Sequence, residues 1–313
     1  MGYDATNYLP SSIQKKKFVE FIKLLGFEGN GDYYYFYKDE DYKYLYGVGL
    51  TISEDNKKLS VHTRTPIFCS AHDLQFQNYT IKQIRQYFGG YFVTDRGTNK
   101  YFANKRLDTV PAERGCYAAH FGLSNLYSNI YLLIQNHKEE EGQSKALEYF
   151  GIPSSAVLLS NITTTYIASI IENYFRQLYI ALLKYSNKKE NIIISSKINH
   201  YDLFDVSENK IGMEEAVAQS KSFQNIHKAD SYFREIDKRI DIKGTLSKPY
   251  HRRKETLFNT LDRMLEQRHS FVHHLNVDAN YNITELEKDV KTIKVALDMV
   301  YAHICEIYNW KHS

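Results

Sequence analysis

The spacing of apolar residues along this chain changes character near residue 110. Before that point, short runs rich in tyrosine, phenylalanine and β-branched residues alternate with polar turns, a pattern that predicts strands. After it, apolar residues recur at steps of three and four over long stretches, which predicts helices. The sequence therefore predicts an α+β domain followed by an all-α helical bundle.

The first region, residues 1–110, combines two predicted helices with several strands. One helix carries Phe18 and Ile22 and ends at Gly26, and a second runs from about Tyr79 to the two glycines after Phe88. The predicted strands and a closing hairpin that turns at Arg96-Gly97-Thr98 occupy residues 33–37, 42–52, 58–65 and 91–102. We interpret this region as a sensor or recognition domain.

The second region divides into a helical connector, residues 111–150, and a bundle, residues 151–313. The first long helix of the bundle has an apolar stripe on one face and carries Glu172 and Arg176 on the opposite face. The other helices are predicted at 213–240 and 255–275, with a last helix that starts at the capping box Thr284-x-x-Glu287. The strict steps of four and three in this last helix predict tight packing, within the chain or against a second copy.

One cation interrupts the apolar stripe of the third of these helices. Apolar side chains recur on one face between Leu257 and Leu275, and a turn of about 100° per residue places Arg268 in the middle of that face. A buried guanidinium is costly without a partner, because it does not lose its proton. Arg268 is therefore expected either to pair inside the bundle, with Glu172 as the candidate, or to face a cleft that admits an anion.

Three histidines follow this arginine: His269, His273 and His274. Imidazoles exchange protons near neutral pH, and a guanidinium holds phosphate through directed hydrogen bonds. The combination is suited to breaking a phosphodiester, with a histidine acting on the 2′-hydroxyl or the leaving oxygen. Because five residues turn a helix by about 140°, Arg268 and His273 do not share a face, and His274 stays open as an alternative to His273.

The segment Arg268-His269-Ser270-Phe271-Val272-His273 resembles the R-x4-6-H motif of the HEPN superfamily, in which a polar residue follows the arginine. The order of helices across residues 151–313 is similar as well. A long helix with Glu172 and Arg176 precedes a middle helix that ends near Arg239, the motif helix and a closing amphipathic helix. The resemblance therefore implies a HEPN-like helical bundle.

The family's chemistry implies a metal-independent endoribonuclease that leaves a 2′,3′-cyclic phosphate, in a cleft where the motifs of two protomers meet. Arg268 would position the scissile phosphate, His273 would be the acid/base, His269 the supporting polar residue, and Glu172 would face the cleft. Proteins with a HEPN domain behind an unrelated sensor are typically bacterial toxins or antiphage abortive-infection effectors. This implies an RNA substrate, a homodimer, and a phage-derived or antitoxin regulator.

Other interpretations of the same residues stay open. His269 and His273 are four apart, as two zinc ligands on one helix would be, with His303 on a neighbouring helix, but the glutamate of an HExxH motif is missing. Arg268 could instead form a structural ion pair while the histidines border the core. A third alternative is a non-catalytic HEPN-like module for nucleotide or RNA binding, or for dimerisation.

Tyrosine is unusually common, with 27 residues, and much of this surplus is crowded into the first region. The run from Tyr33 to Tyr37 could stack on bases, with Arg64 among the cations available for phosphates. Alternating aromatic residues are more often the half-buried face of a sheet. Lysine and arginine exceed the acidic residues only enough to give a net charge of +3, so any basic site is local.

Three cysteines, Cys69, Cys116 and Cys305, are odd in number and far apart, which predicts reduced thiols in a cytoplasmic protein. No run of apolar residues is long enough to span a membrane, so no membrane partner is expected. The sequence contains no P-loop, dinucleotide fingerprint or kinase signature. We therefore predict no cofactor and no metal.

Overall fold

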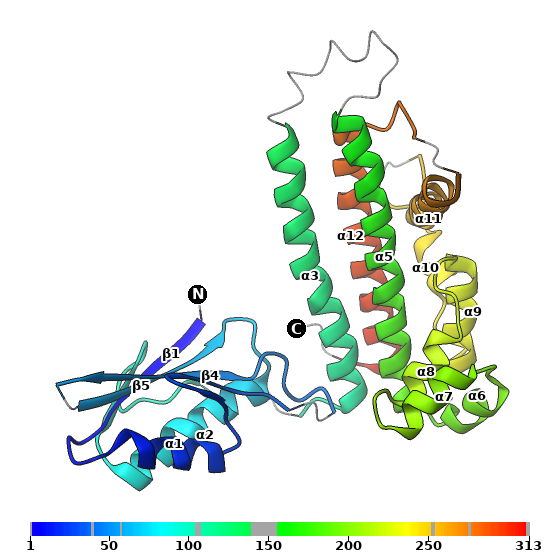
Figure 1. Cartoon of the computed structure of the whole chain (residues 1–313). Helices are drawn as coiled ribbons and strands as arrows, with labels where there is room; N and C mark the ends of the chain where they lie inside the picture. The colour runs from blue at the N-terminus through cyan, green and yellow to red at the C-terminus, as the bar shows by residue number, and fades with distance from the viewer. Residues whose placement is uncertain are drawn as a thin grey trace. The chain divides into compact units, whose positions relative to one another are not determined.

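A computed structural model of the chain describes residues 2–38, 41–56, 58–103, 108–138, 155–251, 254–274 and 277–310, apart from the side chains at 124, 125, 137, 138 and 273. The chain divides into two compact units, the sheet unit (Met1–Arg114) and the helical unit (Gly115–Ser313). An antiparallel sheet characterises the first and helices the second (Figure 1). The predicted order, α+β followed by mostly α, is confirmed at this level.

The sheet unit contains one antiparallel sheet with two helices on one of its faces (Figure 1). In the described residues its strands are β1 (Gly2–Tyr8), β2 (Glu28–Asn30), β3 (Tyr33–Phe36), β4 (Val48–Asp55), β5 (Lys58–Pro66), β6 (Tyr91–Thr94) and β7 (Gly97–Thr98). They lie in the order β2-β3-β4-β5-β1-β6-β7. The helices α1 (Lys15–Leu24) and α2 (Ala71–Phe88) supply Phe18, Ile22 and Ile84 to the core beneath the sheet.

β1 is a central strand that the sequence analysis did not predict. It pairs with β5 and with β6. Its inward residues include Ala5 and Asn7, and the Asn7 side-chain amide donates to the Ile81 carbonyl at 3.4 Å. With so few apolar residues the segment lacks the alternation that marked the other strands, so its pairing partners decide its structure.

α2 begins eight residues before the predicted start at Tyr79. Ser70 caps it: the Ser70 hydroxyl accepts from the Asp73 amide at 2.9 Å, and the Asp73 carboxylate accepts from the Ser70 amide at 2.8 Å. Asp73 also accepts from the backbone of residues 45–47, which holds the segment before β4 as a loop rather than as the predicted strand. The final hairpin turns at Asp95 and Arg96, because Val93 already pairs with Thr98.

The helical unit is built around three long helices (Figure 1). Its described helices are α3 (Pro111–Lys138), α5 (Ser155–Lys184), α6 (Lys189–Ser195), α7 (His200–Ser207), α8 (Met213–Gln219), α9 (Ile226–Ile236), α10 (Ile242–Leu246), α11 (Leu257–His274) and α12 (Ile283–Tyr308). α5 packs against α12 and α11, and at its C-terminal half against α8 and α9. The apolar stripe predicted for the last helix is buried, as Leu286, Ile293, Val300 and Ile304 show.

α3 covers the described part of the segment predicted as a connector, and it packs into the helical unit. The ring of His120 stacks on Tyr301 of α12 with centroids 4.3 Å apart and an interplanar angle of 6°. Tyr174 of α5 donates to the Leu297 carbonyl at 3.2 Å. Residues 139–154, which include the rest of the predicted connector, lie outside the described residues.

Two predicted helix boundaries in this unit are wrong. The helix expected from Met213 to Ile240 is two helices, α8 and α9, and Asn225 caps the second by accepting from the Lys228 amide at 3.0 Å. The last helix starts earlier than its predicted capping box, because Asn282 accepts from the Thr284 amide at 3.0 Å and acts as the cap. Both errors come from asparagine caps, which compete with a continuing helix.

Within the described part of the chain, no helix combines the length and the apolar character that crossing a bilayer requires.

Candidate functional site

Arg268 lies on the face of α11 that packs into the helical unit. Leu261, Met264 and Leu265, which precede it on this face, are buried, and α11 packs against both α5 and α12. Arg268 itself is half-buried. The structure therefore places Arg268 within the apolar stripe of α11, as the sequence predicts.

The Nε atom of Arg268 is buried and has no hydrogen-bond partner among the described residues. An unsatisfied buried donor costs free energy, and an ionised group increases that cost. Such a donor is stabilised when an anion or ordered water reaches it. Arg268 as a residue is half-buried, so part of it is accessible to solvent.

Arg263, on the same helix, shows how a structural arginine is paired here. Its two terminal nitrogens donate to the Asp289 carboxylate at 2.9 and 2.8 Å, and Tyr281 donates to the same carboxylate at 3.0 Å. The hydrogen bond to Asp289 raises the pKa of the Arg263 guanidinium. Burial, followed by the charge of Asp289, raises the pKa of the Tyr281 hydroxyl. Among the residues that the structure describes, the ion pair that the structural interpretation requires therefore exists in α11 at Arg263 and not at Arg268.

Glu172, the predicted partner of Arg268, does not pair with it in the described residues. Glu172 is 9% exposed, and its Oε1 atom is buried without a hydrogen-bond partner there. Arg176, one turn further along α5, has a buried Nε that also has no hydrogen-bond partner in the described residues. The expectation that these two residues lie on an outward face is not met for Glu172, because α5 is buried on nearly all sides.

The histidines lie at the C-terminal end of α11. His269 and His274 are exposed, and their rings contact each other with centroids 6.2 Å apart and an interplanar angle of 77°. His273 belongs to the same helical turn, and its side chain lies outside the described residues. The structure thus groups two of the three imidazoles on the accessible end of the helix that carries Arg268.

The zinc alternative gains no support from the described residues. His303 accepts from the Asp241 amide through Nε2 at 3.1 Å, and burial lowers the pKa of His303 from its usual 6.5. No group of three or more histidine, cysteine or acidic side chains in the described ranges is placed to share a metal ion. The three cysteines are buried free thiols, as predicted.

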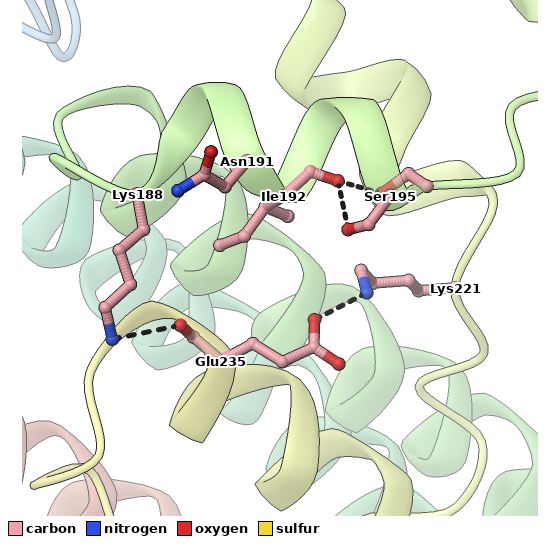
Figure 2. A pocket seen from close by; sticks show the side chains of 7 residues that line it. Lys188, Asn191, Ile192, Ser195, Lys221 and Glu235 are labelled. Atoms are coloured by element: carbon pink, nitrogen blue, oxygen red, sulfur yellow. Dashed lines mark hydrogen bonds and ion pairs between the residues drawn. The ribbon is translucent and has the colours of Figure 1, made fainter.

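A separate pocket lies between α6, α9 and the loop before α9 (Figure 2). Lys221 donates to the Glu235 carboxylate at 2.9 Å, and Lys188 donates to the Glu235 backbone carbonyl at 3.4 Å. Ser195 donates to the Ile192 carbonyl at 3.1 Å. None of the residues predicted for catalysis lines this pocket, and its polar groups largely satisfy one another.

Two further features of the structure were not predicted from the sequence. Gln267 and Thr165 also carry buried oxygens without partners in the described residues, on the same two helices as Arg268 and Glu172. In the sheet unit, His62 contacts Asp4 and Thr6 across neighbouring strands. That contact depends on the register of β1, so only a prediction of β1 could have found it.

Comparison with known proteins gives no relative for this chain: no protein-family model, curated protein or solved structure matches it.

Proposed function

We propose that this protein is a metal-independent endoribonuclease of HEPN type, whose helical unit is a HEPN-like bundle. The observation that carries the proposal is the buried Nε of Arg268, which has no partner among the described residues and lies in the apolar stripe of α11 beside a cluster of histidines. Arg263 on the same helix pairs with Asp289, so Arg268 differs in this respect from the other arginine of the described α11.

In this proposal Arg268 binds the scissile phosphate and His273 transfers the proton to or from the reacting oxygens. His269, exposed next to Arg268, supports the reaction as the polar residue of the motif. Glu172 contributes a buried carboxylate from the helix that packs against α11. The 2′-hydroxyl attacks the adjacent phosphorus, the bond to the 5′-oxygen breaks, and a 2′,3′-cyclic phosphate results.

Homodimerisation belongs to the same proposal. Along α5, Leu158, Ile162 and Tyr166 are spaced by four residues and exposed, so they form an apolar stripe on one side of the helix. Val272, near the end of α11, is exposed too. Exposed apolar stripes of this kind mark contacts with another protein surface, and a second copy is the partner that the motif calls for.

The biological role follows from the resemblance. We propose a toxin or antiphage abortive-infection effector, controlled through the sheet unit by a phage-derived or antitoxin regulator. The buried free thiols are consistent with the reducing cytoplasm.

The test is incubation of the purified full-length protein with total cellular RNA in EDTA, followed by end-group analysis of the fragments. Arg268→Ala and His273→Ala should each lower cleavage by about 100-fold or more, because one removes the phosphate ligand and the other the proton-transfer group. Thermal unfolding of Arg268→Ala should stay near the wild-type temperature, since the Arg268 Nε donates no hydrogen bond to a described residue.

Arg239→Ala is the matched control, because it removes an exposed arginine charge away from α11. It should lower cleavage by no more than the general loss of one cation. RNA binding without cleavage by the wild type would favour the non-catalytic module instead. If both site variants lose the folded protein, the structural interpretation holds.

A further inference from the structure

The sheet of the sheet unit has one covered and one uncovered face. α1 and α2 lie on the same side (Figure 1), and both hydrophobic clusters of this unit lie between them and the strands. β3 shows the difference: Tyr34 and Phe36 are buried, whereas Tyr33 and Tyr35 are exposed. In the described part of this unit, no helix packs over the face that carries Tyr33 and Tyr35.

Strand register gathers the exposed rings of this face into two ridges. Tyr33 and Tyr35 form the first, on β3. Tyr8 of β1 and Tyr91 of β6 pair in register and form the second, with stacked rings whose centroids are 4.9 Å apart at an interplanar angle of 22°. We call the surface that includes both ridges the tyrosine face.

Between the ridges the floor of the tyrosine face carries small side chains. Thr51 lies next to Tyr33 in register, and Gly49 lies next to Tyr35. A Cβ at Gly49 would lie 3.5 Å from the Tyr33 hydroxyl, in ordinary van der Waals contact, so the Tyr33 ring lies across β4. β3 and β1 are three strand spacings apart, which separates the ridges by about 14 Å.

A polar network occupies the centre of the floor. His62 contacts the Asp4 carboxylate through Nε2 at 3.1 Å and the Thr6 hydroxyl through Nδ1 at 3.3 Å. Arg64 reaches Asp4 through one nitrogen at 3.5 Å, and 54% of its side chain is still exposed. Lys58 is exposed on the same face of the same strand, β5. Cationic side chains therefore follow the strand that runs between the ridges.

We propose that the tyrosine face binds single-stranded nucleic acid, with bases stacked on the two ridges and phosphates near Arg64 and Lys58. Every base has a flat π surface, and exposed aromatic rings on a sheet with a nearby cation are how such strands are bound without a fixed sequence. The inference concerns the sheet unit and does not require that the helical unit cleaves RNA.

The alternative occupant is a peptide, and the geometry favours it less. A peptide gains affinity from a sheet mainly by pairing with the unpaired backbone groups of an edge strand. The centre of a sheet face offers no such groups, only side chains. The carboxylates of Asp4 and Asp55 on this face lie opposite Arg64 and Lys58 in register, and Glu28 on β2 lies opposite Tyr35. The face therefore carries no excess of positive charge to attract phosphates. Stacking is then the main source of affinity, and the dependence on salt should be shallow.

The test measures binding of short labelled oligonucleotides to the full-length protein by fluorescence anisotropy in EDTA. One arm uses 2′-O-methyl RNA, which lacks the attacking hydroxyl and is not cleaved. The other arm uses DNA of the same sequence, and comparing the two Kd values shows whether the face prefers RNA or binds any single strand. Tyr33→Ala and Tyr91→Ala should each raise Kd by about 5- to 100-fold, because each removes a stacking ring. Tyr33→Phe keeps the ring and should stay within about twofold of wild type.

Tyr79→Ala is the matched control. Tyr79 is 45% exposed and Tyr91 48%, but Tyr79 lies on α2, on the covered side. Its replacement should leave Kd unchanged. The series is repeated in an Arg268→Ala chain, so that contacts in the helical unit cannot mask the effect. A photoreactive 5-iodouridine strand should crosslink to peptides that contain Tyr33 or Tyr91.

Two results would overturn the proposal. One is wild-type affinity for nucleic acid in Tyr33→Ala and Tyr91→Ala, or no binding by the wild type at all. The other is a change in oligomeric state without a change in binding: light scattering would show an oligomer for the wild type and a smaller species for the variants. The tyrosine face would then join two copies of the chain.

Discussion

Asp73 connects more backbone groups than any other side chain described above. Its Oδ1 accepts from the Gly47 amide at 2.8 Å, and its Oδ2 accepts from the amides of Leu45, Tyr46 and Ser70 at 3.1, 3.2 and 2.8 Å. Asp73→Ala would leave these donors without their acceptor. We expect the free energy of unfolding of the sheet unit to fall by about 2–4 kcal/mol, measured by urea unfolding followed by circular dichroism.

An exposed aspartate provides the comparison. Asp32 pairs with Lys15 on the surface, with 63% of the Asp32 side chain exposed, so Asp32→Ala should cost no more than about 0.5 kcal/mol. Trp310, the chain's one tryptophan, lies in the helical unit, and its fluorescence follows that unit separately. An Asp73→Ala protein with the wild-type midpoint would show that the loop of residues 45–47 is held by other contacts.

At the residue scale, the sequence predicted the position of Arg268 on its helix but not the residues that surround it in the folded chain. Helical periodicity depends only on neighbours along the chain, so it placed Arg268 within the apolar stripe. The burial of Glu172 on α5 follows from helices far away in sequence, because α8, α9, α11 and α12 all pack against α5. The pairing of Arg263 with Asp289 joins two helices, so periodicity along one helix could not predict it either.

At the element scale, His303 joins two helices through a contact that needs a neutral ring. Its Nε2 accepts from the amide of Asp241, the N-cap of α10. Burial lowers the pKa of His303 in the folded state below the usual 6.5, so the unfolded state binds more protons once the pH falls under that value. The free energy of unfolding should therefore keep its full value above pH 6.5. It should decline as the pH falls below 6.5, and the decline should end once the pH lies below the pKa of His303 in the folded state.

The decline is measured as the change of Tm from above to below pH 6.5. His303→Gln keeps an acceptor in the same region and does not titrate, so its Tm should fall less over the same interval. Asp241, Glu306 and Lys248 also act on the His303 pKa, the two acids raising it and the lysine lowering it. Identical pH profiles for the two proteins would assign the acid sensitivity to other groups.

Element types were easier to predict than their ends. α12 has a regular stripe over its whole length, and it was found because that pattern repeats many times. The break between α8 and α9 comes from one cap, at Asn225, within a stretch whose apolar spacing continues in phase. β1 has mostly polar residues and becomes a strand because β5 and β6 pair with it. Periodicity carries no information on either of these.

At the scale of the whole molecule, the division into two units was visible as a change of period, from two to between three and four. The boundary at Arg114 lies just after the start of α3, so a helix begins in one unit and continues in the other. The uncovered tyrosine face was not visible in the same way. Alternation shows that two faces of a strand differ, and only the positions of α1 and α2 show which face is covered.

The proposed homodimer gives the last prediction. The stripe of Leu158, Ile162 and Tyr166 on α5 should be covered by the second copy, because an apolar surface of this regularity is stabilised by contact with another. Ile162→Glu places a charge in that contact, so light scattering should show a monomer where the wild type is a dimer. RNA cleavage should fall with it, since the proposed site needs two motifs.

The comparison that decides this is Ile194→Glu. Ile194 is 83% exposed on α6, outside the stripe, and Ile162 is 55% exposed. The two substitutions add the same charge to an exposed isoleucine, so a general effect on solubility or on RNA repulsion would appear in both. A dimer that resists Ile162→Glu would show that this stripe is not its interface. A wild-type protein that is monomeric at every concentration would place the proposed catalytic residues within a single chain. In that case Arg268 would have to act with a histidine of its own α11, where His269 and His274 are the exposed ones.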